Sequence, residues 1–308
     1  MNKKFKSLMK LMVIVTLTAI SFVGCGKKEE ENINEGKITV FTSILPQKYF
    51  VEKIGGNRVK VQVLVSPGKN PATYEPTPGQ VIGLSNAKIL FTVGVPFENT
   101  FLEKVRANLK NTKIVDTSFG IKKRYLETHS HDSNHDDHET NHHTNTEDPH
   151  IWMSPILVKI QAKNIYNALI KEDPQGKEDY LKGYENIITE LDELDMYLKN
   201  KLAPYKGNKI FVYHPSFGYF TDEYGLHQEA VETGGKEPVP AILEKIIQDA
   251  KKDNVKIVFV QPEFSKKSAN AIAKAINGKV VTLNPLNPDY INNIKKIADE
   301  IQGVLKNE

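Results

Sequence analysis

Short apolar runs alternate with longer helix-like segments along the chain, and this alternation constrains the fold more than any other feature. Residues 38–41 form an apolar run, and valine occupies every second position from Val59 to Val65. Similar strand-like runs recur at 88–93, 113–115, 209–213, 255–260 and 279–283. Because strands separated by helices favour parallel pairing, the sequence predicts an α/β fold with layered, mostly parallel sheets.

One predicted helix is much longer than the others. Apolar residues recur at three- and four-residue spacing from Leu181 to Leu202, as in an amphipathic helix. A continuous helix of this length spans about 40 Å, so it can pack along two lobes and hold them at a fixed separation. We therefore expect an N-terminal α/β lobe at 37–173, a rigid linking helix at 174–203 and a C-terminal α/β lobe at 204–308.

The start of the chain has the pattern of an export signal. Four lysines precede an uncharged, mostly apolar stretch from Leu11 to Val23. Such a stretch spans roughly 20 Å as a helix, which is short for a hydrocarbon core of about 30 Å and typical of a secretory signal. It ends in Gly24-Cys25, which resembles a bacterial lipobox. We expect a signal peptide at 1–24, lipidation at Cys25 and a tether at 25–36, with an incidental cysteine after a plain signal peptide as the alternative.

The charge balance excludes one class of function. The 308 residues include 41 Lys+Arg against 38 Asp+Glu, a formal charge of +3. Loss of residues 1–24 removes four lysines and no acidic residue, so the mature chain has no basic surplus for nucleic acid. The single cysteine also excludes an intrachain disulfide framework.

Three polar loops directly follow predicted strands, and we expect them to line one cleft. They begin after Val65, after Tyr213 and after Leu283, and ligands in α/β proteins bind at the carboxyl ends of strands. His214 stands in the second loop, and His150 lies just before a helix opened by Ser154-Pro155. Two histidines in a cleft suit a borderline-soft cation such as zinc, although ordinary hydrogen-bonded histidines remain an alternative on spacing alone.

Four segments of the chain resemble signature segments of a known family. They are Asn70-Pro-Ala-Thr-Tyr-Glu-Pro76, Asp148-Pro-His-Ile-Trp-Met-Ser-Pro155, His214-Pro-Ser-Phe-Gly-Tyr-Phe220 and Val280-Val-Thr-Leu-Asn-Pro-Leu286. In order and spacing the chain is similar, over 37–305, to the zinc/manganese solute-binding lipoproteins of ABC transporters (cluster A-I), and to their zinc branch with a histidine-rich loop. The resemblance implies two lobes bridged by a rigid helix, with a metal in the cleft between them.

The resemblance also implies metal ligands, of which this chain retains two. His150 and His214 match family ligands, whereas Ala72 replaces a histidine and Asn284 replaces the usual aspartate. The order Gln261-Pro-Glu263 also departs from the family's Glu-Pro-Gln. Alanine cannot ligate, and asparagine offers only a neutral carbonyl, so the substitutions remove two strong donors and one negative charge.

Three accounts of the ligand therefore stay open. Zinc binds through His150 and His214, with water, Asn284, Glu75 or Glu263 completing the coordination shell. Alternatively, the room beside Ala72 admits a metal that carries its own chelator. In the third account, the cleft binds a small organic solute and the histidines donate or accept hydrogen bonds.

A histidine-rich segment within the predicted N-terminal lobe differs in composition from the rest of the chain. Residues 129–143 contain four acidic residues, no apolar residue and six histidines: His129, His131, His135, His138, His142 and His143. Neutral imidazoles suit zinc, nickel or copper, so we expect an auxiliary loop at 129–147 that delivers zinc to the cleft. A low-complexity insertion with incidental metal affinity is the alternative.

No catalytic motif appears in the sequence. It lacks a His-Glu-x-x-His segment and a G-x-S-x-G elbow, so we expect no enzyme. We predict a monomeric, extracytoplasmic lipoprotein, anchored to the bacterial cell membrane, that captures zinc for an ABC permease and its ATPase. The alternative from another functional class is a surface protein that buffers metal or acts as an adhesin.

Overall fold

The structure, a computed structural model, describes residues 36–126, 146–232 and 239–306. By internal contacts the chain divides into residues 1–36 and a compact unit at 37–308. The predicted signal peptide, Cys25 and all six histidines of the predicted auxiliary loop lie outside the described residues. Within the part that is described, no helix is long and apolar enough to cross a membrane.

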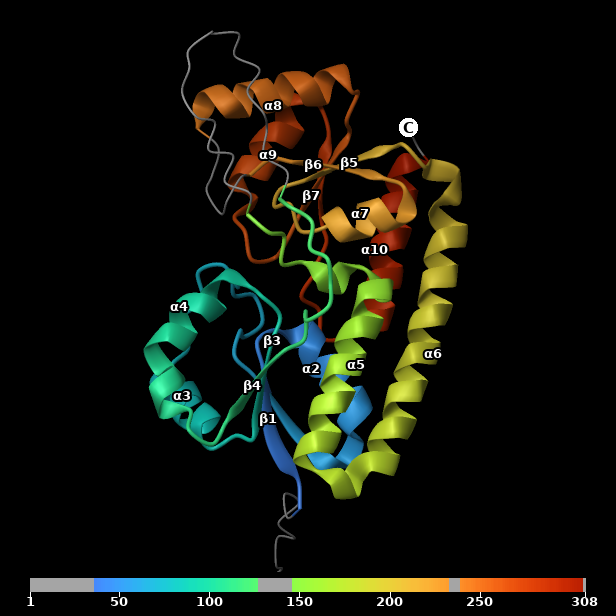
Figure 1. Ribbon diagram of the computed structural model, residues 1–308. Helices are drawn as coiled ribbons and strands as arrows, with labels where there is room; N and C mark the ends of the chain where they lie inside the picture. Colours follow the sequence, from blue (N-terminus) through green and yellow to red (C-terminus); the bar gives the residue numbers. More distant parts are fainter. Residues whose placement is uncertain (1–35, 127–145, 233–238, 307–308) are drawn as a thin grey trace, which may run out of the picture. The chain divides into compact units, whose positions relative to one another are not determined.

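The N-terminal lobe is built on a four-stranded sheet of order β2-β1-β3-β4, with every neighbouring pair parallel. Its strands are β1 (Ile38–Thr42), β2 (Val59–Val63), β3 (Ile89–Thr92) and β4 (Lys113–Asp116). Its helices are α2 (Leu45–Gly55), α3 (Pro78–Ser85), α4 (Pro96–Val105) and α5 (Pro155–Glu172). Helices α3 and α4 lie on one side of the sheet, and α2 and α5 lie on the other (Figure 1).

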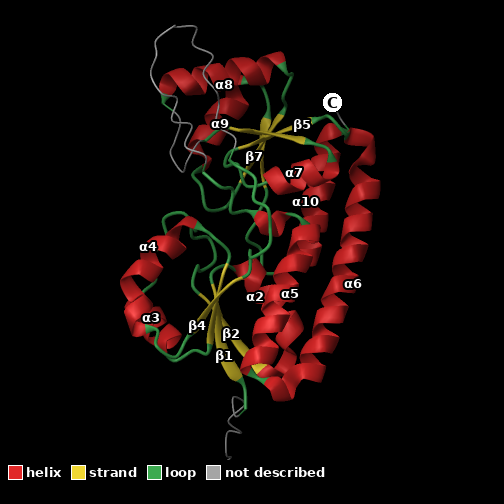
Figure 2. Ribbon diagram, viewed as in Figure 1, coloured by secondary structure: helices red, strands yellow, loops and turns green. Residues whose placement is uncertain are grey.

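The C-terminal lobe repeats the same topology with the order β6-β5-β7-β8, again all parallel. Its strands are β5 (Lys209–Val212), β6 (His227–Ala230), β7 (Ile257–Val260) and β8 (Lys279–Thr282). Its helices are α7 (Gly218–Tyr224), α8 (Pro240–Lys252), α9 (Lys266–Ala275) and α10 (Tyr290–Leu305). The predicted fold class, two parallel α/β lobes joined by a long helix, is confirmed (Figure 2).

The long helix α6 (Lys177–Leu202) runs beside both lobes (Figure 1). Short 3₁₀ turns at Pro174–Gly176 and Ala203–Tyr205 precede and follow it. It packs against α5 and α2 of the first lobe and against α10 of the second. Gly183 allows the close crossing with α2, because a Cβ there would lie 2.5 Å from the Ile54 carbonyl oxygen. One hydrophobic core therefore continues from the N-terminal sheet through α6 to α10.

A second, smaller core fills the space between the C-terminal sheet and helices α8 and α9. Three of the described helices and strands were not predicted from the sequence, namely α3, α7 and the edge strand β6. The sequence of β6, His227-Gln-Glu-Ala, contains one apolar residue. An edge strand with an exposed side carries little hydrophobic pattern, so its pairing depends on the neighbouring β5.

Candidate metal-binding cleft

A cleft of about 1090 Å³ lies where loops of the two lobes meet. Residues 70–73 line it from the loop after β2, and residues 214–216 line it from the loop after β5. Pro285 and Leu286 contribute from the loop after β8. The structure thus brings together the three loops that the sequence places at strand ends, since parallel strands present their carboxyl ends at one edge.

His150 and His214 both line this cleft and lie side by side. Their ring centroids are 5.2 Å apart, with the ring planes at 75° to each other. The His150 side chain is 11% exposed and the His214 side chain 15% exposed. Two partly buried imidazoles from different lobes therefore meet at one point, as the sequence predicts for a pair of ligands to one cation.

The orientation of His150 is set by a residue two positions earlier. Asp148 Oδ1 accepts hydrogen bonds from the His150 backbone N–H at 2.9 Å and from its ring Nδ1 at 2.7 Å. The ring of Trp152 packs edge-on against His150, with centroids 5.2 Å apart. Because Nδ1 donates to a carboxylate, Nε2 is the nitrogen that retains a lone pair.

Asp148 is fully buried, and contacts from both lobes hold it. Arg124 Nη1 lies 3.4 Å from its Oδ2, and the Tyr219 hydroxyl donates to its backbone carbonyl at 2.8 Å. A Cβ at Gly218 would lie 1.2 Å from the Arg124 guanidinium, so a larger residue where α7 begins would displace this guanidinium. The buried carboxylate therefore has a cation and a ring nitrogen as partners.

The segment 150–153 is also tied to the C-terminal lobe. The Trp152 indole N–H donates to the Pro285 carbonyl at 3.0 Å. In return, the Tyr290 hydroxyl donates to the Trp152 carbonyl at 2.8 Å. These buried bonds fix His150 relative to the loop after β8.

The orientation of His214 is set by a residue from a neighbouring strand. Its Nδ1 lies 2.5 Å from Glu232 Oε2, and Glu232 is 1% exposed. Phe264 stacks on the imidazole, with centroids 4.7 Å apart and planes at 24°. Gln261 accepts from the His214 backbone N–H at 3.2 Å and donates to its carbonyl at 2.7 Å. The glutamine at 261, which departs from the family pattern, thus clamps the loop that carries His214.

Strand register brings Glu232 to His214. In the β5–β6 pair, Lys209 lies opposite His227 and Val212 lies opposite Ala230. The pairing continues beyond the strands, because the Glu232 backbone N–H donates to the Tyr213 carbonyl at 2.8 Å. This glutamate was not predicted because β6 has little strand-like pattern, and the register of that strand is the signal that locates it.

Burial in the cleft lowers the pKa of His214, and the hydrogen bond to Glu232 opposes this only in part. Removing a histidine from water disfavours its charged form. A neutral imidazole is the form that ligates a metal. The environment of His214 therefore favours the protonation state that a metal ligand needs.

Ala72 and Asn284 occupy different places relative to the histidines. Ala72 lines the main cleft, where its methyl group offers no donor atom. Asn284 lines a small adjacent pocket of about 50 Å³, and its side-chain oxygen accepts from the Leu286 backbone N–H at 2.9 Å. Ligation by Asn284 stays a prediction, and it would require this turn to open or the oxygen to be shared.

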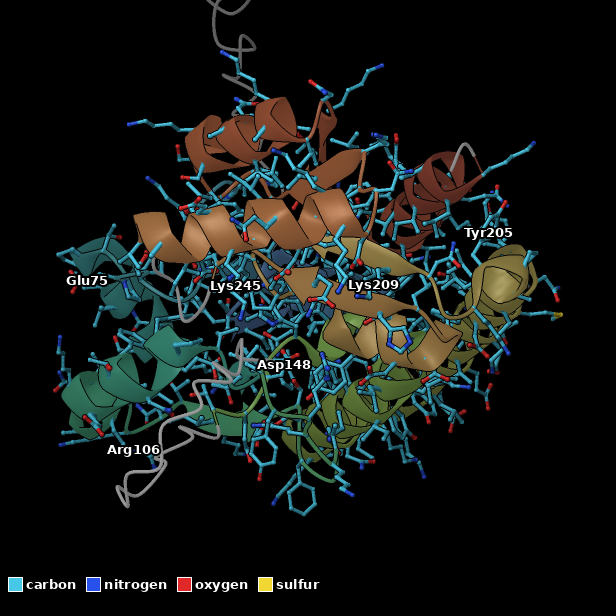
Figure 3. The ribbon with its side chains drawn as sticks, turned by 90° about the horizontal axis from the view of Figure 1, so that it is seen from above. Glu75, Arg106, Asp148, Tyr205, Lys209 and Lys245 are labelled. Atoms are coloured by element: carbon cyan, nitrogen blue, oxygen red, sulfur yellow. The ribbon has the colours of Figure 1, made fainter. Side chains whose placement is uncertain are left out.

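The two carboxylates proposed to complete the shell differ in position. Glu263 lines both the main cleft and the adjacent pocket, and burial raises its pKa. Glu75 is exposed and is not among the lining residues; Figure 3 shows it at the outer edge of the N-terminal lobe, far from Asp148. Glu263 is therefore the better placed of the two, and a role of either in ligation stays a prediction.

Another carboxylate lines the cleft from the N-terminal lobe. Glu98 is 4% exposed and accepts from the backbone N–H groups of Val93 and Gly94, at 2.9 and 2.7 Å. Burial raises its pKa to about 7. Its hydrogen bonds hold the loop between β3 and α4, which is a structural use of the carboxylate. Within the described ranges, no three His, Cys, Asp or Glu side chains form a group that could hold a metal ion.

The ends of the histidine-rich segment lie at the rim of the cleft. Tyr125 and Glu147 form an antiparallel bridge, and the Leu126 backbone N–H donates to the Thr146 carbonyl at 2.9 Å. Leu126, Thr146 and Glu147 are among the residues that line the cleft. The described residues on either side of this segment therefore line the same cleft as His150 and His214.

Comparison with known proteins gives one family over nearly the whole described chain. Residues 40–304 match the family model described as zinc-uptake complex component A, periplasmic. The high-affinity zinc uptake system protein ZnuA of Bacillus subtilis is 29% identical, over 93% of this chain and 90% of that protein. The manganese ABC transporter substrate-binding lipoprotein PsaA of Streptococcus anginosus is 27% identical, over 86% of this chain and 85% of its own.

Solved structures agree with this match. A crystal structure of ZnuA superposes with a TM-score of 0.79 at 37% identity, covering 87% of this chain and 99% of the other. A deletion mutant of ZnuA, described as zinc-bound, superposes with a TM-score of 0.78 at the same identity, covering 87% of this chain and 98% of the other. Both comparisons extend over the two lobes and the helix between them.

Proposed function

The chain belongs to the family of periplasmic zinc-uptake component A proteins, and from this premise we propose that it captures zinc in its cleft and delivers it to an ABC permease. The family consists of transport substrate-binding components rather than enzymes. Binding and release of the ion, without a chemical step, is the whole activity that we assign to this chain.

The pairing of His150 with His214 is the observation that carries the proposal. Their rings lie 5.2 Å apart, and each directs Nδ1 to a buried carboxylate. Neutral imidazoles whose second nitrogen is held by a carboxylate are a common form of zinc ligand. Nitrogen donors also favour zinc over manganese, which prefers oxygen.

Two imidazoles do not fill the tetrahedral shell that zinc prefers. We assign the remaining positions to water and to Glu263, which lines the same cleft and would have to move toward the histidines to reach the ion. A site completed in this way exchanges its cargo more readily than one with four protein ligands. That property suits a protein that must release its ion to a permease.

We also propose the cellular setting of the protein. Extracytoplasmic location is typical of the family, and lipidation at Cys25 would hold the mature, monomeric protein at the cell membrane. The partners would be a permease and its ATPase. The auxiliary histidines at 129–143 would collect zinc at the rim of the cleft, where that segment begins and ends.

A second candidate ligand is a metal that arrives with its own chelator. The cleft volume of about 1090 Å³ is far larger than an ion and a few waters require, since a water occupies about 30 Å³ in the liquid. Ala72 leaves space where a longer side chain would project. Donor atoms of a small chelator could fill the coordination positions that this chain leaves open.

Calorimetric titration of the purified protein with zinc tests the proposal. Stoichiometric binding that is lost in His150→Ala supports zinc capture, with His227→Ala as the control because His227 lies on the exposed edge strand β6. Binding only to a preformed zinc–citrate complex would favour the chelated metal. The absence of binding in both titrations would contradict the proposal and leave the organic solute. Unchanged growth at limiting zinc after deletion would instead favour a buffering or adhesin role.

A further inference from the structure

We propose that Glu232 is a positioning residue for the bound ion: it holds His214 as the Nδ1–H tautomer, so that Nε2 keeps its lone pair for a divalent cation. This inference rests on the proposed function, because it concerns how the same cleft prepares a ligand. It adds a residue outside every motif on which the family resemblance depends, since Glu232 lies just after the edge strand β6.

The contact itself defines the tautomer. An ionised carboxylate only accepts hydrogen bonds, so the ring nitrogen that faces it must carry the proton. His214 Nδ1 lies 2.5 Å from Glu232 Oε2, a direct hydrogen bond whose acceptor is a carboxylate. The other ring nitrogen of a neutral imidazole is then unprotonated and available to a metal.

The surroundings of His214 make any other orientation of its ring energetically unfavourable. Phe264 stacks on one face of the imidazole at 4.7 Å, and Gln261 clamps the backbone of the same residue through two hydrogen bonds. Rotating the ring by half a turn would place a carbon against Glu232 and break the bond. The glutamate therefore selects one ring orientation as well as one tautomer.

Glu232 is poorly explained as a residue that serves stability alone. It is 1% exposed, and within the described residues its second oxygen, Oε1, has no hydrogen-bond partner. A buried, unpaired carboxylate oxygen destabilises the folded protein. Buried polar groups that break this rule commonly belong to functional sites. The unpaired oxygen is the second, independent observation in favour of a role toward a cation.

The same arrangement occurs on the opposite wall of the cleft, where Asp148 accepts from His150 Nδ1 at 2.7 Å. Two buried carboxylates therefore stand behind the two imidazoles. Since Asn284 is neutral, these carboxylates place negative charge near a divalent cation without contacting it. Such outer-shell carboxylates orient histidines and increase their basicity toward metals.

Nitrogen NMR of the metal-free protein tests the tautomer directly. Long-range ¹H–¹⁵N spectra of ¹⁵N-histidine protein, with His214 assigned from the spectrum of His214→Ala, should show the Nδ1–H form. In Glu232→Leu, the Nε2–H form should become a major species, and zinc affinity should fall about 10- to 100-fold. Glu232→Gln, which keeps the shape of the side chain and a carbonyl acceptor, should lose less zinc affinity than Glu232→Leu. Glu229→Gln is the control, because Glu229 lies on β6, three residues before Glu232, and pairs with Lys209.

Thermal unfolding of the same metal-free variants separates positioning from a structural role. Because Oε1 of Glu232 has no hydrogen-bond partner within the described residues, Glu232→Leu should lower the unfolding temperature less than Asp148→Asn does, since Asp148 has partners on both oxygens. An unchanged His214 tautomer in Glu232→Leu would overturn the inference, and so would unchanged zinc affinity alongside normal zinc binding by the unsubstituted protein. If the unsubstituted protein binds no zinc, the proposed function fails, and the tautomer spectra still decide the role of Glu232.

Discussion

The two histidines of the cleft receive the same kind of support from regions that are built differently. His150 bonds to Asp148, two residues away in the same loop, whereas His214 bonds to Glu232, eighteen residues away and just after strand β6. Asp148 has Arg124 as a further partner, while Oε1 of Glu232 has none within the described residues. The first pair joins two residues of one loop, whereas the second depends on the register of β6 beside β5, so the position of Glu232 follows only from the sheet.

The largest expected effect tests whether both regions contribute to one site. Either His150→Ala or His214→Ala should reduce zinc affinity by more than about 100-fold, because each removes one of two nitrogen donors. Competition with a fluorescent zinc chelator measures the change. If one variant kept the original affinity, the two histidines would not share an ion.

The next effect separates the two supporting carboxylates. Asp148→Asn should reduce zinc affinity about 10- to 100-fold, and it should also destabilise the metal-free protein by about 1–3 kcal/mol. The stability loss is expected because Asp148 is fully buried and has both a ring nitrogen and Arg124 as partners. Urea unfolding measures it, and the comparison with Glu232 would be wrong if Asp148→Asn cost no stability.

A smaller change, a gain in zinc affinity, should come from adding a donor at Ala72. Ala72→His places an imidazole on the loop after β2, which lines the same cleft as His150 and His214. A third nitrogen should raise zinc affinity about tenfold or more, or about 1.4 kcal/mol. The same titration measures the gain, with Ala72→Leu as a size control. Equal affinity in Ala72→His and the parent protein would show that this wall lies out of reach of the ion.

The smallest effect concerns pH. Because burial lowers the pKa of His214, this residue should be less than half protonated at pH 6.5, which is near the ordinary histidine value. Its protonation should then weaken zinc binding less than about twofold at that pH, and more as the pH falls further. The unfolded chain takes up the proton at higher pH, so below pH 6.5 the metal-free protein should lose stability as pH falls. An NMR titration midpoint for His214 above 6.5 would contradict this.

Much of the fold follows from local pattern. The alternating valines of β2, the apolar repeat of α6 and the Ser154-Pro155 start of α5 identify those elements without tertiary contacts. Strand β6 cannot be identified from local pattern, because its four residues contain one apolar side chain and its conformation depends on pairing with β5. The candidate site divides in the same way, since the loops after strands were predictable and the register between two strands was not.

By itself, the sequence determined the α/β class, the long helix, the loops that line the cleft and the two histidines that face each other in it. The class, the helix and the loops depend on residue periodicity and on where strands end, which neighbouring residues encode, whereas the two histidines were assigned from their match to the family's ligand positions. Only the tertiary structure decided that Glu232 lies behind His214, that Asn284 faces an adjacent small pocket and that Glu75 lies on the outer surface. The reason is physical: these placements depend on parallel register and loop packing, which join residues that are distant in the chain.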